Sequence, residues 1–170
     1  MFGEGPRRAE LMLVGEMPGD REDLAGHVFV GPAGRELDAA LERAGIVRGD
    51  AYVTNVVKHF KFRERGKRRI HDTPKKSEVD ACVPWLREEL RLVRPSVLVI
   101  LGATAGKALL GSKFRLTAAR GAEIESDLAP HVTATIHPAA ILRQRDRASR
   151  EAEREAFTAD LESAAALLGS

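Results

Sequence analysis

The sequence predicts an α/β fold, a three-layer sandwich with a central four-stranded parallel sheet flanked by helices. Four short apolar runs follow one another along the 170 residues, and helix-forming segments separate them. The inner runs are apolar throughout, which is typical of parallel strands covered on both faces. A hydrophobic content of 44% is sufficient for one domain with a real core, so we expect residues 1–170 to form a single domain.

The first half of the chain begins with a predicted strand at residues 11–14. A helix follows over residues 35–44, because apolar side chains recur there at helical spacing and Gly45 ends the pattern. A second strand is predicted at residues 52–57. A loop rich in basic residues comes next.

In the second half, Ser77 is predicted to cap a helix that runs to residue 90, and Pro95 introduces a strand that Gly102 ends. The remaining expected elements are a strand at 97–101, a short helix at 105–110, a hairpin around Arg120-Gly121, a strand at 132–136 and a last helix at 150–168.

Polar residues follow these strands where each strand ends. Glu16 follows the first, Asn55 lies toward the end of the second with the basic loop after it, the segment 102–104 follows the third and His137 the fourth. The carboxyl ends of parallel strands meet at one edge of the sheet, where α/β proteins hold ligands. We therefore expect these residues to cluster there.

The loop after the first strand is rich in glycine and proline and carries the carboxylates of Glu16 and Asp20. It has neither the Gly-x-Gly-x-x-Gly pattern nor a closing Gly-Lys-Ser/Thr, which excludes both common nucleotide-binding loops. The functional interpretation gives Glu16 a chemical role. The alternative is that the glycines only form turns and that both carboxylates are solvated.

The net charge of +2 hides an uneven distribution. Nine Lys or Arg against Glu64 and Asp72 give residues 58–76 a charge of +7, and the rest of the chain sums to −5. Such a loop attracts a polyanion, and nucleic acid is the commonest candidate; the alternative is a solvated charge run. Phe60 and Phe62 alternate with basic residues, which is the arrangement needed to stack on a displaced nucleobase. The alternative is that the two rings face inward from a strand.

Other classes of protein are excluded by composition. No stretch approaches the roughly 18 to 20 apolar residues that span a bilayer, and no signal peptide is recognisable. The single cysteine, Cys82, excludes an intrachain disulfide. We expect a monomeric cytoplasmic protein without a membrane partner.

Five motifs, in order and each after its strand, resemble the uracil-DNA glycosylase superfamily in its iron–sulfur branch. They are Gly15-Glu-Met-Pro-Gly19, Phe29-Val-Gly-Pro-Ala-Gly34, Val53-Thr-Asn55, Leu101-Gly-Ala103 and His137-Pro138. Lys67-Arg-Arg-Ile-His71 resembles the insertion of the UdgX type, whose members become covalently linked to uracil-containing DNA. The resemblance covers nearly the whole chain.

The resemblance implies an enzyme that takes uracil from a single strand or flips it from a duplex, and cleaves its N-glycosidic bond. Phe29 would stack on the base and Asn55 would bind its edge. His137 would donate to a carbonyl where negative charge develops. Gly15 and Asp20 are further expected uracil-binding residues, and Lys67, Arg68 and Arg69 are expected to bind DNA.

The resemblance also implies that His71 replaces water and attacks the sugar carbon, with Glu16 orienting it and stabilising the imidazolium. Two other functions stay open. One is a conventional multiple-turnover uracil-DNA glycosylase of base excision repair, and the other is a non-catalytic nucleic-acid binding module.

The departure from the resembled branch is at the metal. Relatives carry a [4Fe-4S] cluster whose first two cysteines precede the first strand, and no cysteine precedes Leu11 here. Cys82 and His59 are the only remnants, and a cluster needs about four ligands. We expect no cofactor for this polypeptide: either the lineage has lost the cluster, or the N-terminus is truncated.

Overall fold

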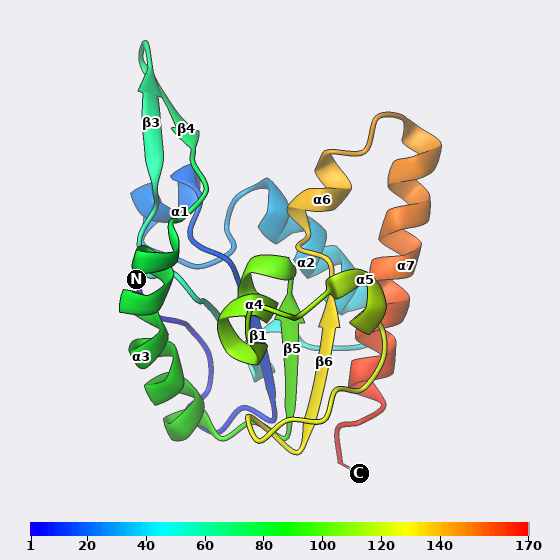
Figure 1. Ribbon diagram of the computed structural model, residues 1–170. Helices are drawn as coiled ribbons and strands as arrows, with labels where there is room; N and C mark the ends of the chain where they lie inside the picture. The colour runs from blue at the N-terminus through cyan, green and yellow to red at the C-terminus, as the bar shows by residue number, and fades with distance from the viewer. Residues whose placement is uncertain (170) are drawn as a thin grey trace.

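Four strands form one parallel sheet in the order β2-β1-β5-β6 (Figure 1). They are β1 (Leu11–Gly15), β2 (Ala51–Asn55), β5 (Val97–Leu101) and β6 (His131–Thr135). This computed structural model describes residues 1–169, so Ser170, the last residue of the predicted domain, lies outside the described residues. The predicted fold class is confirmed.

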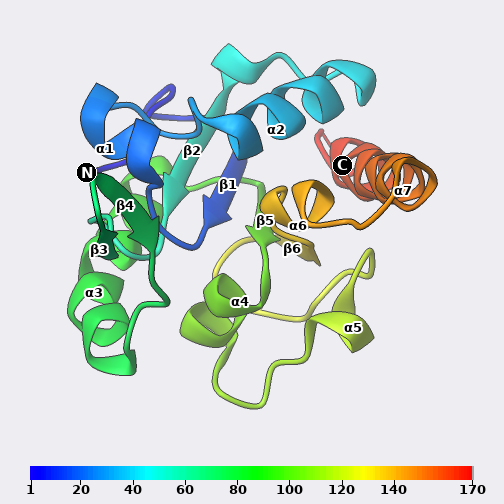
Figure 2. The ribbon, with the colours of Figure 1, turned by 90° about the horizontal axis from the view of Figure 1, so that it is seen from above.

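Helices cover both faces of the sheet (Figure 2). Alternate residues of β1 separate the two cores: Leu11 and Leu13 belong to the cluster that contains residues of α2 and α7, and Met12 and Val14 to the cluster that contains residues of α3 and α4. This alternation follows from the period of two along a strand. The covering helices are α2 (Pro32–Arg43), α7 (Arg147–Ala165), α3 (Lys76–Val93) and α4 (Ala103–Leu110).

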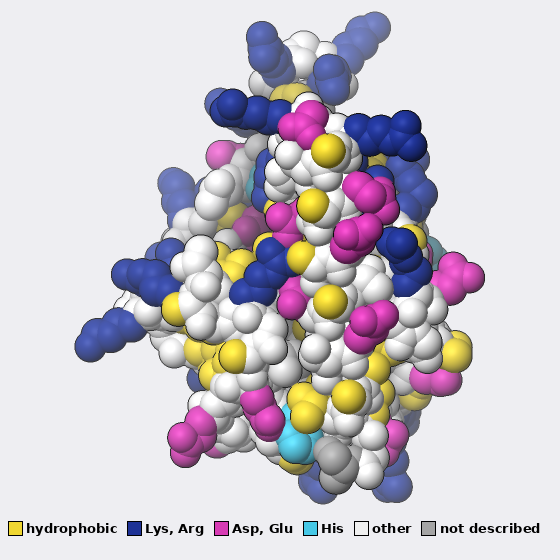
Figure 3. All heavy atoms as spheres, turned by 90° about the vertical axis from the view of Figure 1, so that its right-hand side faces the viewer, with side chains coloured by type: hydrophobic (Ala, Val, Ile, Leu, Met, Phe, Trp, Pro, Cys, Tyr) yellow, Lys and Arg dark blue, Asp and Glu magenta, His cyan; other side chains and the backbone are white. Residues whose placement is uncertain are grey.

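The basic segment, predicted as a loop, contains an antiparallel hairpin of β3 (Phe62–Arg65) and β4 (Arg68–His71). The hairpin extends beyond the carboxyl edge of the sheet (Figure 1). Lys and Arg side chains gather at that upper end of the molecule in Figure 3. In the hairpin, Phe62 at the start of β3 pairs with His71 at the end of β4. These paired residues lie at the base of the hairpin, nearest the body of the protein.

Several predicted boundaries differ from the structure for identifiable local reasons. Helix α2 begins at Pro32, a residue favoured at the first helical position. Lys75 rather than Ser77 is the N-cap of α3, because Glu78 accepts the backbone N–H of Lys75. Helix α7 begins at residue 147, where the side chain of Asp146 caps it.

The hairpin predicted around Arg120-Gly121 is wrong. The chain forms a short helix, α5 (Leu116–Ala119), after which Arg120 makes an isolated bridge with Ala134 of β6. Three short elements were also not predicted, namely α1 (Asp20–Ala25), the 3-10 helix η1 (Arg48–Asp50) and α6 (Ala139–Leu142). Within residues 1–169, no helix has the length and apolar character needed to cross a membrane.

Candidate active site

A cleft of about 920 Å³ opens at the carboxyl edge of the sheet, between α1, α6 and the hairpin. Among its lining residues are Glu16, Phe29, Asn55, His71 and His137, which lie far apart in the sequence. The topology brings them together because β1, β2 and β6 all end at this edge. Lys67, Arg68 and Arg69 of the hairpin line the same cleft.

The end of β1 approaches the end of β2 too closely for a side chain. Gly15 lies opposite Asn55 in the register of the sheet. A Cβ atom on Gly15 would lie 2.6 Å from the Oδ1 atom of Asn55 and 2.6 Å from the ring of Phe29. Gly15 therefore allows the amide and the aromatic ring to reach the same small space.

Phe29 is held in a strained backbone conformation, with φ at +53°. Such a conformation persists only where the surroundings enforce it. A Cβ atom on Gly34 would lie 1.8 Å from the carbonyl oxygen of Phe29, and the buried carboxylate of Glu22 accepts the N–H of Gly31 at 2.7 Å. The ring of Phe29 lies 5.8 Å from that of His137, at an interplanar angle of 29°.

Asn55 carries an unsatisfied polar atom into the cleft. The residue is 3% exposed, and no residue among 1–169 supplies a hydrogen-bond partner for its buried Oδ1 atom. Buried polar atoms are nearly always paired in native proteins, so an unpaired acceptor that lines a cleft is available to a ligand. An acceptor here suits a ligand that presents an N–H group.

His137 is a neutral donor at neutral pH. Burial lowers its pKa to about 4, and the positive charge of Arg143 acts in the same direction, against the attraction of Glu16. The Nδ1 atom accepts the backbone N–H of Ala139 at 3.2 Å. The ring hydrogen is therefore on Nε2, which can donate to a ligand.

Glu16 is the carboxylate that the cleft keeps ionised. Burial raises its pKa, but hydrogen bonding to His71 and Thr104, together with the electrostatic influence of the His137 and His71 imidazoles, outweighs burial, and the net shift is downward. The Oε1 atom lies 3.3 Å from the Nε2 atom of His71. The side chain of His71 is 53% exposed and that of Glu16 is 24% exposed, so both can be reached from the cleft.

Arg69 fastens the hairpin to α1. Its Nε atom donates to Asp20 at 2.6 Å and its Nη1 atom to Asp23 at 2.7 Å. Its guanidinium carbon lies 5.3 Å and 5.0 Å from the ring centroids of Phe60 and Phe62, within the range of a cation–π contact. We name this set of contacts the Arg69 latch.

The three basic residues predicted to bind DNA differ in their contacts. Lys67 and Arg68 are exposed and make no ion pair with another residue among 1–169, so their charges are available to a polyanion. Arg69 is engaged inside the protein. Asp20, expected to bind uracil, here pairs with Arg69 across the rim of the cleft.

The two residues expected as remnants of a metal site do lie near each other. The Sγ atom of Cys82 is 4.0 Å from the Nδ1 atom of His59, and it accepts the backbone N–H of Lys58 at 3.4 Å. Among residues 1–169, no three His, Cys, Asp or Glu side chains are grouped to hold a metal. This pair by itself therefore does not fit a cluster with about four protein ligands.

Several residues that build this site have no role predicted from the sequence. Thr104 stands at the predicted edge but received no function, and Glu22 lay in an unpredicted helix. The buried pair of Lys58 and Glu89 was also missed. A signal existed for Glu89, because it falls on the apolar face of its helix between Leu86 and Val93.

Comparison with known proteins identifies the class. The family model of the uracil DNA glycosylase superfamily matches residues 2–162, and the chain belongs to that superfamily. It is 39% identical over 149 residues to the Type-4 uracil-DNA glycosylase of Pyrobaculum aerophilum, covering 84% of this chain and 72% of that protein. It is 37% identical over 151 residues to the Type-4 uracil-DNA glycosylase of Thermotoga maritima, covering 88% and 75%.

A more distant relative is the Type-5 uracil-DNA glycosylase of Pyrobaculum aerophilum. It is 32% identical over 150 residues, which cover 79% of this chain and 63% of that protein.

The low pKa of His137 predicts a specific acid sensitivity of the fold. Unfolded, its imidazole binds a proton near pH 6.5, whereas folded it stays neutral to about pH 4. The unfolded state therefore holds more protons in this window, and stability falls as the pH falls through it. Denaturant unfolding at pH 7 and at pH 4 measures this effect. Between the two pH values, the free energy of unfolding of His137→Asn should fall by about 3 kcal/mol less than that of wild type.

The matched control is His27→Asn, which replaces a histidine whose side chain is 66% exposed. Equal acid losses in His137→Asn and wild type would contradict the assignment of a neutral, buried His137.

Proposed function

We propose that this protein excises uracil from DNA, acting on single strands, and then becomes covalently linked to the abasic sugar through His71. The observation that carries the proposal is the contact of 3.3 Å between His71 and Glu16 in the cleft that also contains Asn55, Phe29 and His137. A nucleophile, a carboxylate and a set of base-binding groups thus share one space.

The base-binding groups match the edge of uracil. The unpaired Oδ1 atom of Asn55 can accept the N3–H of the base, and the Nε2–H of His137 can donate to a carbonyl oxygen. Phe29 offers a ring at the wall of the cleft for stacking. As the glycosidic bond breaks, its electron pair moves to N1 of uracil, and a donor fixed at the carbonyl stabilises that negative charge.

The sugar becomes electron-poor at C1′ when uracil leaves, and Glu16, whose pKa is lowered, places a negative charge beside it. In the proposed capture step, a lone pair of the neutral imidazole of His71 forms a new bond to C1′. The ring becomes an imidazolium, whose charge the Glu16 carboxylate balances. Uracil leaves as the anion and takes a proton from solvent.

The named relatives favour a second candidate, conventional hydrolysis. They are called uracil-DNA glycosylases of Type 4 and Type 5. In that case Glu16 would activate a water molecule and His71 would take no part. The two functions differ in product: incubation with a uracil oligonucleotide gives a protein–DNA band on a denaturing gel in one and free abasic DNA in the other.

Glu16→Gln tests the carboxylate under either candidate. The amide keeps the size of the side chain but not the charge, so the fold and DNA affinity should persist. We expect the single-turnover rate of uracil release to fall by roughly two to four orders of magnitude, the scale of a positioned acid–base group. A rate equal to wild type would remove Glu16 from the mechanism.

His71→Gly tests the nucleophile. The missing imidazole opens the sugar to water, while Glu16, Asn55 and His137 remain. Wild type should consume about one equivalent of uracil DNA and stop, whereas the variant should form no adduct and release uracil over repeated turnovers. Turnover by wild type, or a heat-stable adduct with the variant, would exclude His71 as the nucleophile.

The Arg69 latch predicts that neighbouring arginines act differently. Arg68→Ala removes an exposed charge, and should lower the log–log slope of DNA affinity against salt by about 0.7 to 0.9 unit. Arg69→Ala frees the hairpin that carries His71, and should slow adduct formation at saturating DNA by about ten- to a hundredfold, the scale of a displaced reacting group.

Asp23→Asn weakens the same latch from α1 and should slow adduct formation in the same direction. If Arg69→Ala reacts as fast as Arg68→Ala at saturating DNA, the latch has no role in placing His71.

A further inference from the structure

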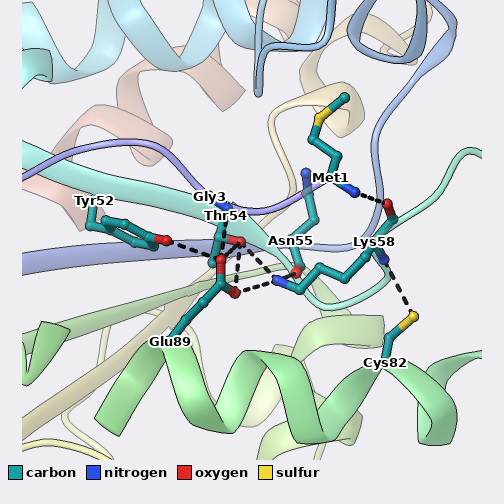
Figure 4. A network of polar contacts seen from close by, with 8 residues as sticks. All are labelled: Met1, Gly3, Tyr52, Thr54, Asn55, Lys58, Cys82 and Glu89. Carbon is teal, nitrogen blue, oxygen red and sulfur yellow. Dashed lines mark hydrogen bonds and ion pairs between the residues drawn. The ribbon is translucent and has the colours of Figure 1, made fainter. Parts of the chain in front are cut away.

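A buried ion pair lies directly behind the recognition amide of Asn55. Lys58 follows the end of β2 and Glu89 comes from α3, and their side chains are 10% and 7% exposed. Figure 4 shows the Lys58 side chain folded back along β2, with its ammonium group between Glu89, Thr54 and Asn55. Nothing in the proposed chemistry uses this pair.

Every hydrogen of the Lys58 ammonium group has an acceptor. The Nζ atom donates to the backbone carbonyl of Asn55 at 2.6 Å, to the hydroxyl of Thr54 at 2.9 Å and to the carboxylate of Glu89. Asn55 is the last residue of β2, which is an edge strand, and the N–H of the next residue, Val56, pairs with β1, so the carbonyl of Asn55 points away from the sheet. A carbonyl in this position needs a partner, and Lys58 supplies it.

Glu89 in turn holds Lys58 and the neighbouring strand. Its carboxylate accepts from the hydroxyl of Tyr52 at 3.0 Å, from the hydroxyl of Thr54 at 3.1 Å and from the backbone N–H of Gly3 at 2.7 Å. Burying two charges is expensive, and an apolar pair of similar size is often equally stable. The network therefore calls for an explanation other than stability.

We propose that Lys58 and Glu89 are positioning residues that fix the backbone of Asn55, and thereby aim its side-chain amide into the cleft. The inference rests on the proposed excision of uracil. The side chain of Asn55 makes no bond within residues 1–169 through its Oδ1 atom, so its direction depends on the backbone beneath it. The hydrogen bond from the Lys58 ammonium group to the carbonyl of Asn55 fixes that backbone on the side away from Gly15.

The test is the paired change Lys58→Met with Glu89→Gln. It removes both charges together, and it leaves an amide whose oxygen can still accept from Tyr52 and Gly3 and whose NH2 group can donate to the hydroxyl of Thr54. We expect the single-turnover rate of uracil release to fall by about ten- to a hundredfold, the scale of a misplaced binding group. Affinity for the same oligonucleotide with a tetrahydrofuran abasic analogue, which has no base for Asn55 to contact, should stay unchanged.

The matched control is Glu78→Gln. It breaks an ion pair of 2.8 Å with Lys61 that joins the same helix to the same segment after β2, without contact with Asn55. This control should release uracil at the wild-type rate. Melting temperatures of both variants show whether a loss of rate follows a loss of fold.

A double-mutant cycle separates positioning from general stability. In an Asn55→Ala background the paired change should have no further effect on the rate, because the group that it positions is gone. An equal loss in both backgrounds, or no loss in the wild-type background, overturns the proposal. If the wild-type chain releases no uracil at all, the proposed function fails instead.

A measurement on the wild-type chain needs neither activity nor a variant. The Lys58 ammonium group should give a slowly exchanging ¹⁵N signal with a scalar coupling, through the hydrogen bond, to the carbonyl carbon of Asn55. The proposal is overturned if the ammonium signal appears without that coupling. It is also overturned if rapid exchange with water erases the signal, because slow exchange is part of the prediction. Both results hold whatever the kinetics show.

Discussion

The pairing of Gly15 with Asn55, at the carboxyl ends of β1 and β2, is the constraint on which the site depends. Parallel register places these residues opposite one another, and the pairing continues beyond the strands, where Val57 donates to the carbonyl of Glu16 at 2.9 Å. Glu16 therefore leaves β1 beside the side-chain amide of Asn55. A side chain at position 15 would collide with Asn55 and Phe29, so this approach is possible only with glycine.

The titratable groups gathered at this edge are held in different protonation states. Burial keeps His137 neutral, and the hydrogen bond from the N–H of Ala139 to Nδ1 leaves the ring hydrogen on Nε2. Glu16 remains an anion, because hydrogen bonds outweigh its burial. A neutral donor for the leaving base and an anion for the sugar are what an oxocarbenium-like reaction requires. The two pKa directions therefore agree with the proposed excision of uracil.

The sequence was sufficient for the sheet and for the edge where the site lies, because apolar runs and strand ends are local signals. It was insufficient for features that depend on tertiary contacts. The ordering of the basic segment as a hairpin requires Arg69 to reach Asp20 and Asp23, some 46 to 49 positions away. No local pattern distinguishes Arg69 from Arg68, and only the folded chain shows that one is engaged and the other exposed.

The groups proposed for recognition and the group proposed for reactivity reside on different parts of this fold. Asn55 ends β2 and His137 follows β6, and Phe29 packs against His137 and at the Cβ position of Gly15, so all three are fixed by the core. His71 comes from a hairpin that is fastened to α1 by the Arg69 latch. Because these supports are separate, the proposed nucleophile can change without disturbing the groups proposed to bind the base. In the proposed function, capture and hydrolysis are therefore two outcomes of one recognition frame, and which of them occurs depends on what the hairpin presents to C1′.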